Sequence, residues 1–204
     1  MIIATDDEGI FRGAREFGAE VRMTAATHQT GTDRIAEVAA ELDCDIVVNI
    51  QGDEAEIEPG AIDTAVDALA RSPEAVMSTL ACRSSDPERA ADPNAVKVVV
   101  APDGRALYFS RAPVPYPRDR EAPTEYLLHV GLYAYRREFL LQYAHMPQTP
   151  LEILEKLEQL RAIENGYVIQ VAETDYEALG IDTPADYEAF VVRERRRHNG
   201  GDTA

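Results

Sequence analysis

An apolar run ends abruptly in a glycine and two carboxylates at residues 48–54, whose sequence is VNIQGDE. Residues 45–50 have the pattern of a buried parallel strand, which places Asp53 just past its carboxyl end, where open α/β sheets bind their ligands. A carboxylate at this position suits a magnesium ion and the phosphate chain that accompanies it. The alternative is an ordinary strand-to-loop turn with solvated acids.

A second carboxylate, Asp182, stands immediately before the sequence TPAD at 183–186, which has a capping box and a proline at the first helical position. Asp182 is therefore held in a turn of fixed shape, either as a ligand or as a local turn acceptor. The sequence TPLE at 149–152 has the same combination of a capping box and a proline at the first helical position. It predicts a helix that runs to Asn165 before Gly166, with Leu154 facing the core and Glu158 and Gln159 on its flank.

The elements that must position these residues alternate strand and helix with short connections. The pattern predicts strands at 1–5, 20–23, 45–50 and 76–82, and helices at 8–17, up to residue 41 and from residue 59. Such βαβ alternation predicts an α/β fold with a doubly wound, mostly parallel sheet.

The middle of the chain departs from this alternation. An Asp-Gly turn at 103–104 between two apolar runs predicts a hairpin of strands 96–100 and 106–109. A proline-rich stretch follows at 113–123, and a strand at 128–135 returns to the core. We therefore expect a single domain over 1–199, with an excursion at about 96–126 that forms a lid or a dimer contact, and a disordered tail at 200–204.

Composition limits the classes of function. The chain has 204 residues, 45% of them hydrophobic, and a net charge of −17, which argues against a nucleic-acid partner. The absence of a signal-peptide pattern or long apolar run predicts a cytoplasmic protein without a membrane segment. Cys44 and Cys82 show no metal-ligand spacing and are interpreted as buried small apolar residues.

Seven segments together resemble the family of 3-deoxy-manno-octulosonate cytidylyltransferase, the CMP-Kdo synthetase. They are HQTGTDR (28–34), QGDE (51–54), PNAVK (93–97), ALYFSR (106–111), HVGLY (129–133), LEQLR (157–161) and GIDTP (180–184). The segments occur in the family's order and span nearly the whole chain. The resemblance implies a Rossmann-like, three-layer nucleotide-sugar transferase fold.

The resemblance also implies a reaction. The anomeric hydroxyl of the sugar acid Kdo would attack the α-phosphate of CTP, giving CMP-Kdo and pyrophosphate for lipopolysaccharide or related glycan synthesis. Asp53 and Asp182 would be the catalytic carboxylates and would hold Mg²⁺, since hard oxygen ligands suit that ion. Asp53 could instead act indirectly on the sugar hydroxyl, and the sequence leaves this open. A homodimer is also implied.

The matching positions imply a set of substrate-binding residues. Arg34 could hold a carboxylate or phosphate, or could form an ion pair on the helix surface. His129 could donate to the sugar, or could be a satisfied structural residue. The full set is His28, Thr32, Arg34, Gln51, Lys97, Arg111, His129, Tyr133, Glu158 and Gln159.

The sequence departs from the family pattern in two places. The family pattern begins one strand and one phosphate-binding loop earlier, so the comparison implies an N-terminally truncated fold. The explanations are a start codon misassigned within a longer gene, a fragment, or a non-catalytic nucleotide- or sugar-binding remnant. AEI at 55–57 replaces the family's proline and apolar pair, which adds a negative charge near the expected phosphate site. A related sugar acid, sialic acid or amino-Kdo, is therefore the alternative substrate.

Overall fold

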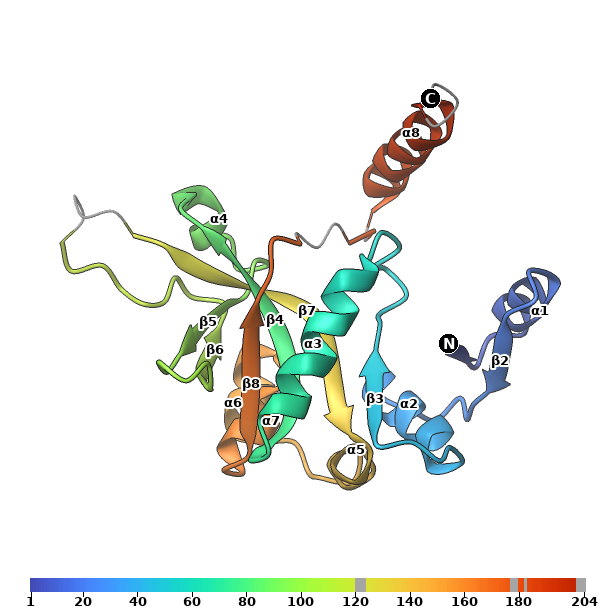
Figure 1. Cartoon of the computed structure of the whole chain (residues 1–204), viewed down its shortest axis with the longest axis horizontal. Helices are drawn as coiled ribbons and strands as arrows, with labels where there is room; N and C mark the ends of the chain where they lie inside the picture. The colour runs from blue at the N-terminus through green and yellow to red at the C-terminus, as the bar shows by residue number, and fades with distance from the viewer. Residues whose placement is uncertain (120–123, 177–179, 182, 201–204) are drawn as a thin grey trace.

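A computed structural model describes residues 1–119, 124–176, 180–181 and 183–200 (Figure 1). The strands are β1 (Ile2–Thr5), β2 (Glu20–Met23), β3 (Ile46–Asn49), β4 (Ala75–Ser84), β5 (Lys97–Val100), β6 (Ala106–Ser110), β7 (Tyr126–Arg136) and β8 (Val168–Glu173). The helices are α1 (Glu8–Glu16), α2 (Gly31–Ala40), α3 (Pro59–Arg71), α4 (Pro87–Ala91), α5 (Arg137–Tyr143), α6 (Pro150–Glu155), α7 (Leu160–Glu164) and α8 (Pro184–Gly200). Of the expected tail, residue 200 ends α8, and 201–204 lie outside the described residues.

The long strand β7 organises the main sheet. One edge of β7 pairs with β4, and its other edge pairs with β5 near its start and with β3 near its end. All three pairings are antiparallel, as is the β5–β6 hairpin, whereas β4 and β8 are parallel. The α/β class is confirmed, but the sheet is mixed rather than mostly parallel. An apolar run predicts that a strand is buried on both faces, but it does not predict whether the strand runs parallel or antiparallel to its neighbours. β7 runs antiparallel because the chain returns from the excursion in the opposite direction.

The first two strands form a separate unit. β1 and β2 pair in parallel as a two-stranded sheet joined through α1. Figure 1 shows this unit, in blue, beside α2 and apart from the main sheet. The βα units at the start of the chain are thus present as predicted, and α2 connects them to β3.

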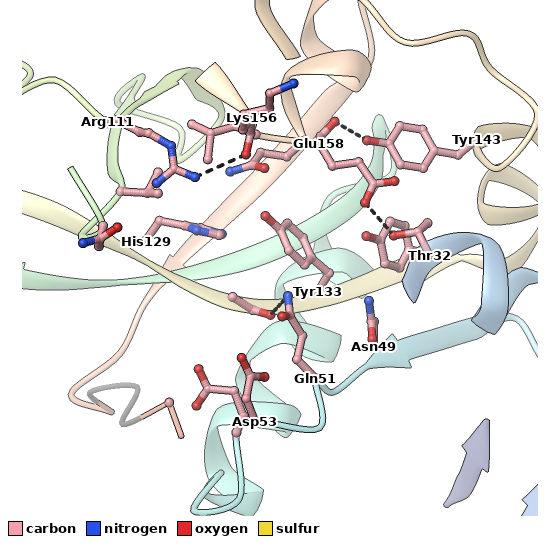
Figure 2. A pocket seen from close by; sticks show the side chains of 18 residues that line it. Thr32, Asn49, Gln51, Asp53, Arg111, His129, Tyr133, Tyr143, Lys156 and Glu158 are labelled. Atoms are coloured by element: carbon pink, nitrogen blue, oxygen red, sulfur yellow. Dashed lines mark hydrogen bonds between the residues drawn. The ribbon is translucent and has the colours of Figure 1, made fainter. Parts of the chain in front are cut away.

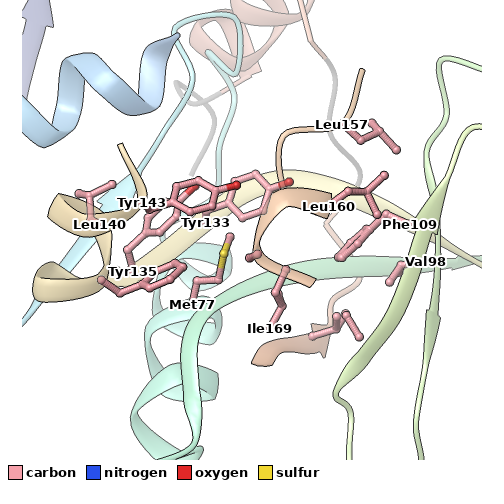
Figure 3. Close-up of a cluster of buried hydrophobic side chains, with 14 of the residues drawn as sticks. Met77, Val98, Phe109, Tyr133, Tyr135, Leu140, Tyr143, Leu157, Leu160 and Ile169 are labelled. Carbon is pink, nitrogen blue, oxygen red and sulfur yellow. The ribbon is translucent and has the colours of Figure 1, made fainter. Parts of the chain in front are cut away.

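The core lies on both faces of the main sheet, which gives the expected three layers. On one face α3 packs with Ala61, Ala65 and Leu69 against β4 and β7. On the other face α2, α5 and α7 cover a cluster that includes Met77, Leu140, Leu160 and the tyrosines of β7 (Figure 3). β7 supplies both faces because its side chains alternate.

The predicted helix at 150–165 is interrupted. α6 ends at Glu155, and its C-cap residue Lys156 has a φ of 54° in the left-handed region, whereas α7 begins at Leu160. Residues 157–159 therefore form a link rather than helical turns. Leu154, expected to face the core from helical spacing, is 77% exposed. No glycine or proline marks the break, so the sequence pattern could not reveal it.

Candidate active site

Two adjacent cavities open at the carboxyl end of β3. The first, of about 480 Å³, brings together eight predicted residues from five separate segments (Figure 2). These eight are Thr32, Gln51, Asp53, Arg111, His129, Tyr133, Glu158 and Gln159. The second, of about 530 Å³, shares Thr32, Asn49, Gln51, Asp53 and Glu158 with the first and adds Arg34.

The segment after β3 is fixed to two other parts of the chain. Gln51 Nε2 donates to the carbonyl oxygen of Gly131 on β7 over 3.4 Å. The backbone N–H of Ile181 donates to the carbonyl oxygen of Asp53 over 3.1 Å. Asp182 itself lies outside the described residues, but its chain neighbour Ile181 is bound to Asp53. The two predicted metal-binding segments therefore meet.

The donor chemistry at this point fits Mg²⁺. Asp53 offers a carboxylate at the cavity wall, and Asn49 and Gln51 add amide oxygens to the lining. Hard oxygen donors with space left for phosphate and water are the surroundings that Mg²⁺ prefers. Across the described part of the chain, no group of three or more histidine, cysteine or acidic side chains forms a metal cage. The fit to Mg²⁺ therefore rests on one or two carboxylates of the protein, with substrate oxygens completing the coordination shell.

The link between α6 and α7 delivers Glu158 and Gln159 to the first cavity. Thr32 Oγ1 donates to Glu158 Oε2 over 3.0 Å, and the Tyr143 hydroxyl donates to the Glu158 carbonyl oxygen over 2.5 Å. Burial raises the pKa of Glu158, although Thr32 and Arg161 oppose that shift. Glu158 Oε1 is buried and has no hydrogen-bond partner. A ligand hydroxyl could satisfy this oxygen.

Cationic groups lie on the opposite side of the cavity from Asp53 (Figure 2). Arg111 donates to the carbonyl oxygens of Pro93, Glu155 and Lys156 over 2.8, 2.7 and 3.3 Å. The Glu155 carboxylate accepts from the backbone N–H of Arg111 over 2.9 Å. These bonds use three of the five guanidinium N–H groups, so a fixed positive charge with donors to spare faces the cavity.

Two predicted substrate contacts lie away from both cavity walls. Lys97 is fully buried, and its Nζ donates to the carbonyl oxygens of Asp92 and Arg111 over 2.9 and 2.6 Å. Burial lowers the pKa of Lys97. His28 contacts the Glu37 carboxylate on α2, and this hydrogen bond lowers the pKa of Glu37. Lys97 Nζ and His28 Nε2 are thus bound within the protein rather than directed at either cavity.

Arg34 faces the second cavity. Its guanidinium forms an ion pair with Asp6 at 3.0 Å and donates to Thr24 Oγ1 over 2.5 Å. The surface ion pair considered from sequence is therefore present, and the residue lines a cavity as well. α2 begins beside it with a complete Thr30–Asp33 capping box.

The unusual Glu56 does not add its charge to the site. Its side chain is only 4% exposed, and Arg193 of α8 binds its carboxylate. Glu56 lies outside the linings of both cavities. The sequence comparison could not show this pairing, because the partner is 137 residues away.

Several lining residues were missed from sequence. Asn49, Asn94, Tyr143 and Lys156 also line the first cavity. Asn49 and Asn94 stand inside or beside segments that were recognised, so their polarity within apolar runs was an available signal. Tyr143 and Lys156 carry no such signal, since the first depends on α5 packing and the second on the unforeseen helix break.

Comparison with known proteins now identifies the class. Residues 1–174 match the sequence profile of the cytidylyltransferase family, to which this chain belongs. The 3-deoxy-manno-octulosonate cytidylyltransferase of Solibacter usitatus is 58% identical over 92% of this chain and 74% of its own length. The enzyme of that name from Geotalea daltonii is 51% identical over 97% of this chain and 82% of its own length.

A solved structure agrees with these relatives. It is described as CMP:2-keto-3-deoxy-manno-octonic acid synthetase complexed with CTP, and it superimposes with a TM-score of 0.89 at 40% identity. The match covers 95% of this chain and 80% of the solved one. The resemblance to the CMP-Kdo synthetases and the nucleotidyltransferase fold are both confirmed. Separately, none of the helices within the described residues has the length and apolar character needed to cross a membrane.

Proposed function

We propose that this protein transfers CMP from CTP to the anomeric hydroxyl of Kdo, releasing pyrophosphate. The observation that carries the proposal is the pair of cavities, about 480 and 530 Å³, that share Asp53 as a common wall. Each is large enough for one substrate. Two substrates placed in them would meet at Asp53, as a direct group transfer requires.

The charges of the two cavities suggest which substrate each one takes. Arg111 and Lys156 in the first cavity suit the carboxylate of a sugar acid, and Glu158, Gln159 and His129 suit its hydroxyls. Arg34 in the second cavity suits the phosphates of a nucleotide. A solved relative is described as complexed with CTP, which supports CTP as one of the two substrates.

We further propose that Asp53 and Asp182 hold Mg²⁺ between the substrates. Bound there, the ion would neutralise the phosphate charge and align the attacking and leaving oxygens. Asp53 keeps the attacking hydroxyl near the α-phosphorus, while the sugar carboxylate is held at the far end by Arg111. As the new oxygen–phosphorus bond forms, the bond to pyrophosphate breaks and the hydroxyl proton leaves to water or Asp53.

Pyrophosphate release tests this proposal. The protein should release it only when CTP, Kdo and Mg²⁺ are all present, and EDTA should abolish the release. Asp53→Asn should lower kcat by at least about 100-fold. The matched control Asp67→Asn, which alters an exposed α3 residue paired with Arg71, should leave the rate unchanged. Binding of CTP without turnover, or full activity of Asp53→Asn, would contradict the proposal.

Competition identifies the sugar acid. Sialic acid and amino-Kdo, supplied with equal concentrations of Kdo, should be used with lower kcat/KM if the first cavity is built for Kdo. A higher kcat/KM for either one would reassign the substrate. This comparison uses the same pyrophosphate assay.

We also propose a homodimer acting in the cytoplasm, where CTP is available. The exposed apolar side chains of Tyr116 and Leu154, 70% and 77% accessible, support an association surface. Sedimentation should give about twice the 22.5 kDa monomer mass. A monomer at micromolar concentration would contradict the dimer.

A further inference from the structure

His129 is held rigidly at the wall of the first cavity. Its ring packs edge-on against Phe109 at a centroid distance of 5.1 Å and lies tilted against Tyr133 at 5.3 Å. It comes from β7, directly before a break in the sheet register. The ring therefore presents one fixed edge to any ligand in the cavity.

The register break places a buried hydroxyl beneath that ring. Thr79 of β4 is opposite Tyr133, whereas its neighbour Leu80 is opposite Val130, so two residues of β7 have no opposite residue on β4. Thr79 is fully buried. Irregularities of this kind often re-aim side chains beside active sites.

The hydrogen bonds of Thr79 determine which ring nitrogen carries the proton. Its Oγ1 lies 2.8 Å from the Leu132 carbonyl oxygen, 3.1 Å from that of Val130 and 2.9 Å from His129 Nε2. Carbonyl oxygens only accept, so the single hydroxyl proton is donated to them. Oγ1 must then accept a hydrogen bond from Nε2–H. Otherwise the lone pairs of Oγ1 and Nε2 would face each other at 2.9 Å with no proton between them.

The other nitrogen of the ring is consequently an acceptor. Burial lowers the pKa of His129 to about 3, so the ring is neutral near pH 7 and carries one proton. That proton is on Nε2, which leaves a lone pair on Nδ1. Within the described residues, the only hydrogen bond of the His129 ring is the one to Thr79.

We propose that Thr79 is a positioning residue that fixes His129 as the Nε2–H tautomer, so that Nδ1 accepts a hydrogen bond from a substrate hydroxyl. This reverses the donor role expected from the sequence. A lone pair at this point attracts a hydroxyl and repels a carboxylate, so it helps turn the sugar acid's carboxylate toward Arg111. The identity of the ligand rests on the proposed function, whereas the tautomer does not.

Nitrogen NMR of the histidine rings tests the tautomer without any turnover. With ¹⁵N-labelled histidine at pH 7, the resonances lost in His129→Gln should show a protonated Nε2 and an unprotonated Nδ1 in the wild-type protein. Thr79→Ser should preserve this pattern. Thr79→Val should move it toward the other tautomer, while the control Thr64→Val, on α3 outside both cavity linings, should not. A protonated Nδ1 in the wild type, or an unchanged ring in Thr79→Val, would overturn the proposal.

Ligand titration tests the acceptor role. Added Kdo should shift the Nδ1 resonance of the wild type, and Thr79→Val should raise KM for Kdo about tenfold with KM for CTP within twofold. Thr79→Ser should restore the KM for Kdo. Equal effects on both KM values, or no shift of Nδ1 with Kdo, would overturn the role. Failure of the proposed function would appear separately, as a wild-type protein that lacks turnover but shows the tautomer.

Discussion

Replacing Arg161 by methionine should destabilise the protein far more than replacing an exposed arginine. Arg161 and Glu152 are each only 4% exposed and form a two-point contact, with N–O distances of 2.9 and 2.5 Å. Burial opposes ionisation of Glu152, but Arg161 and the Thr149 N–H outweigh it and lower its pKa. Arg161→Met leaves that carboxylate buried without its cation.

The expected cost follows from this burial. Removing one partner of a buried ion pair costs about 3–5 kcal/mol, which for a chain of this length lowers Tm by about 6–20 °C. The double variant Glu152→Met/Arg161→Met should regain much of this loss, because no charge is then left buried. The control is Arg83→Met: Arg83 is 55% exposed and binds Glu173, so it should cost less than about 1 kcal/mol.

Urea unfolding followed by circular dichroism measures all of these variants. The reasoning is refuted if Arg161→Met costs no more than Arg83→Met. It is also refuted if the double variant is as unstable as the sum of its single variants, since the ion pair would then carry no coupling energy.

Three further changes test separate parts of the site. Lys156→Val should destabilise by about 1–2 kcal/mol because a β-branched residue resists φ near 54°, whereas Lys156→Gly should be neutral or stabilising in urea unfolding. His129 has a folded-state pKa of about 3, below its unfolded value, so the unfolded state binds more protons between pH 6.5 and 3 and stability falls as pH is lowered. At pH 5 this amounts to about 2 kcal/mol relative to pH 7, and His129→Gln should remove it from the measured pH dependence. Lys97→Met should lose about 2 kcal/mol of stability and raise KM, because the carbonyl oxygens of Asp92 and Arg111 lose their donor.

Each of these predictions has a contradicting result. Equal stability of the Lys156 variants would mean that the helix break does not depend on its backbone conformation. An unchanged pH dependence in His129→Gln would place the titrating group elsewhere. A stable Lys97→Met with normal KM would show that the two carbonyl contacts do not hold the site.

The sequence was sufficient for the local elements and for the parts of the site that follow strands. Asp53 follows β3 as predicted, although β3 is half-buried and antiparallel to β7 rather than a buried parallel strand. The hairpin of β5 and β6 forms at the Asp-Gly turn, where Gly104 has a φ of 82°. These features depend on neighbours in the chain, so they can be read from it.

Features set by distant contacts could not be predicted. The antiparallel course of β7 depends on how the excursion returns, and the link after Lys156 is held by the Tyr143 hydroxyl, which donates to the Glu158 carbonyl oxygen. The roles of Lys97 and Thr79 depend on backbone carbonyls outside their own strands. The pairing of Glu56 with Arg193 likewise joins residues 137 positions apart.

Phosphorus NMR of the complete reaction tests the central claim most directly. The natively expressed protein, with its intact mass recorded first, is mixed with CTP, Kdo and Mg²⁺. The account predicts that the three CTP resonances give way to one phosphodiester signal and to pyrophosphate in equal amounts. Unchanged CTP, or its conversion to CDP and inorganic phosphate, would contradict cytidylyl transfer to Kdo.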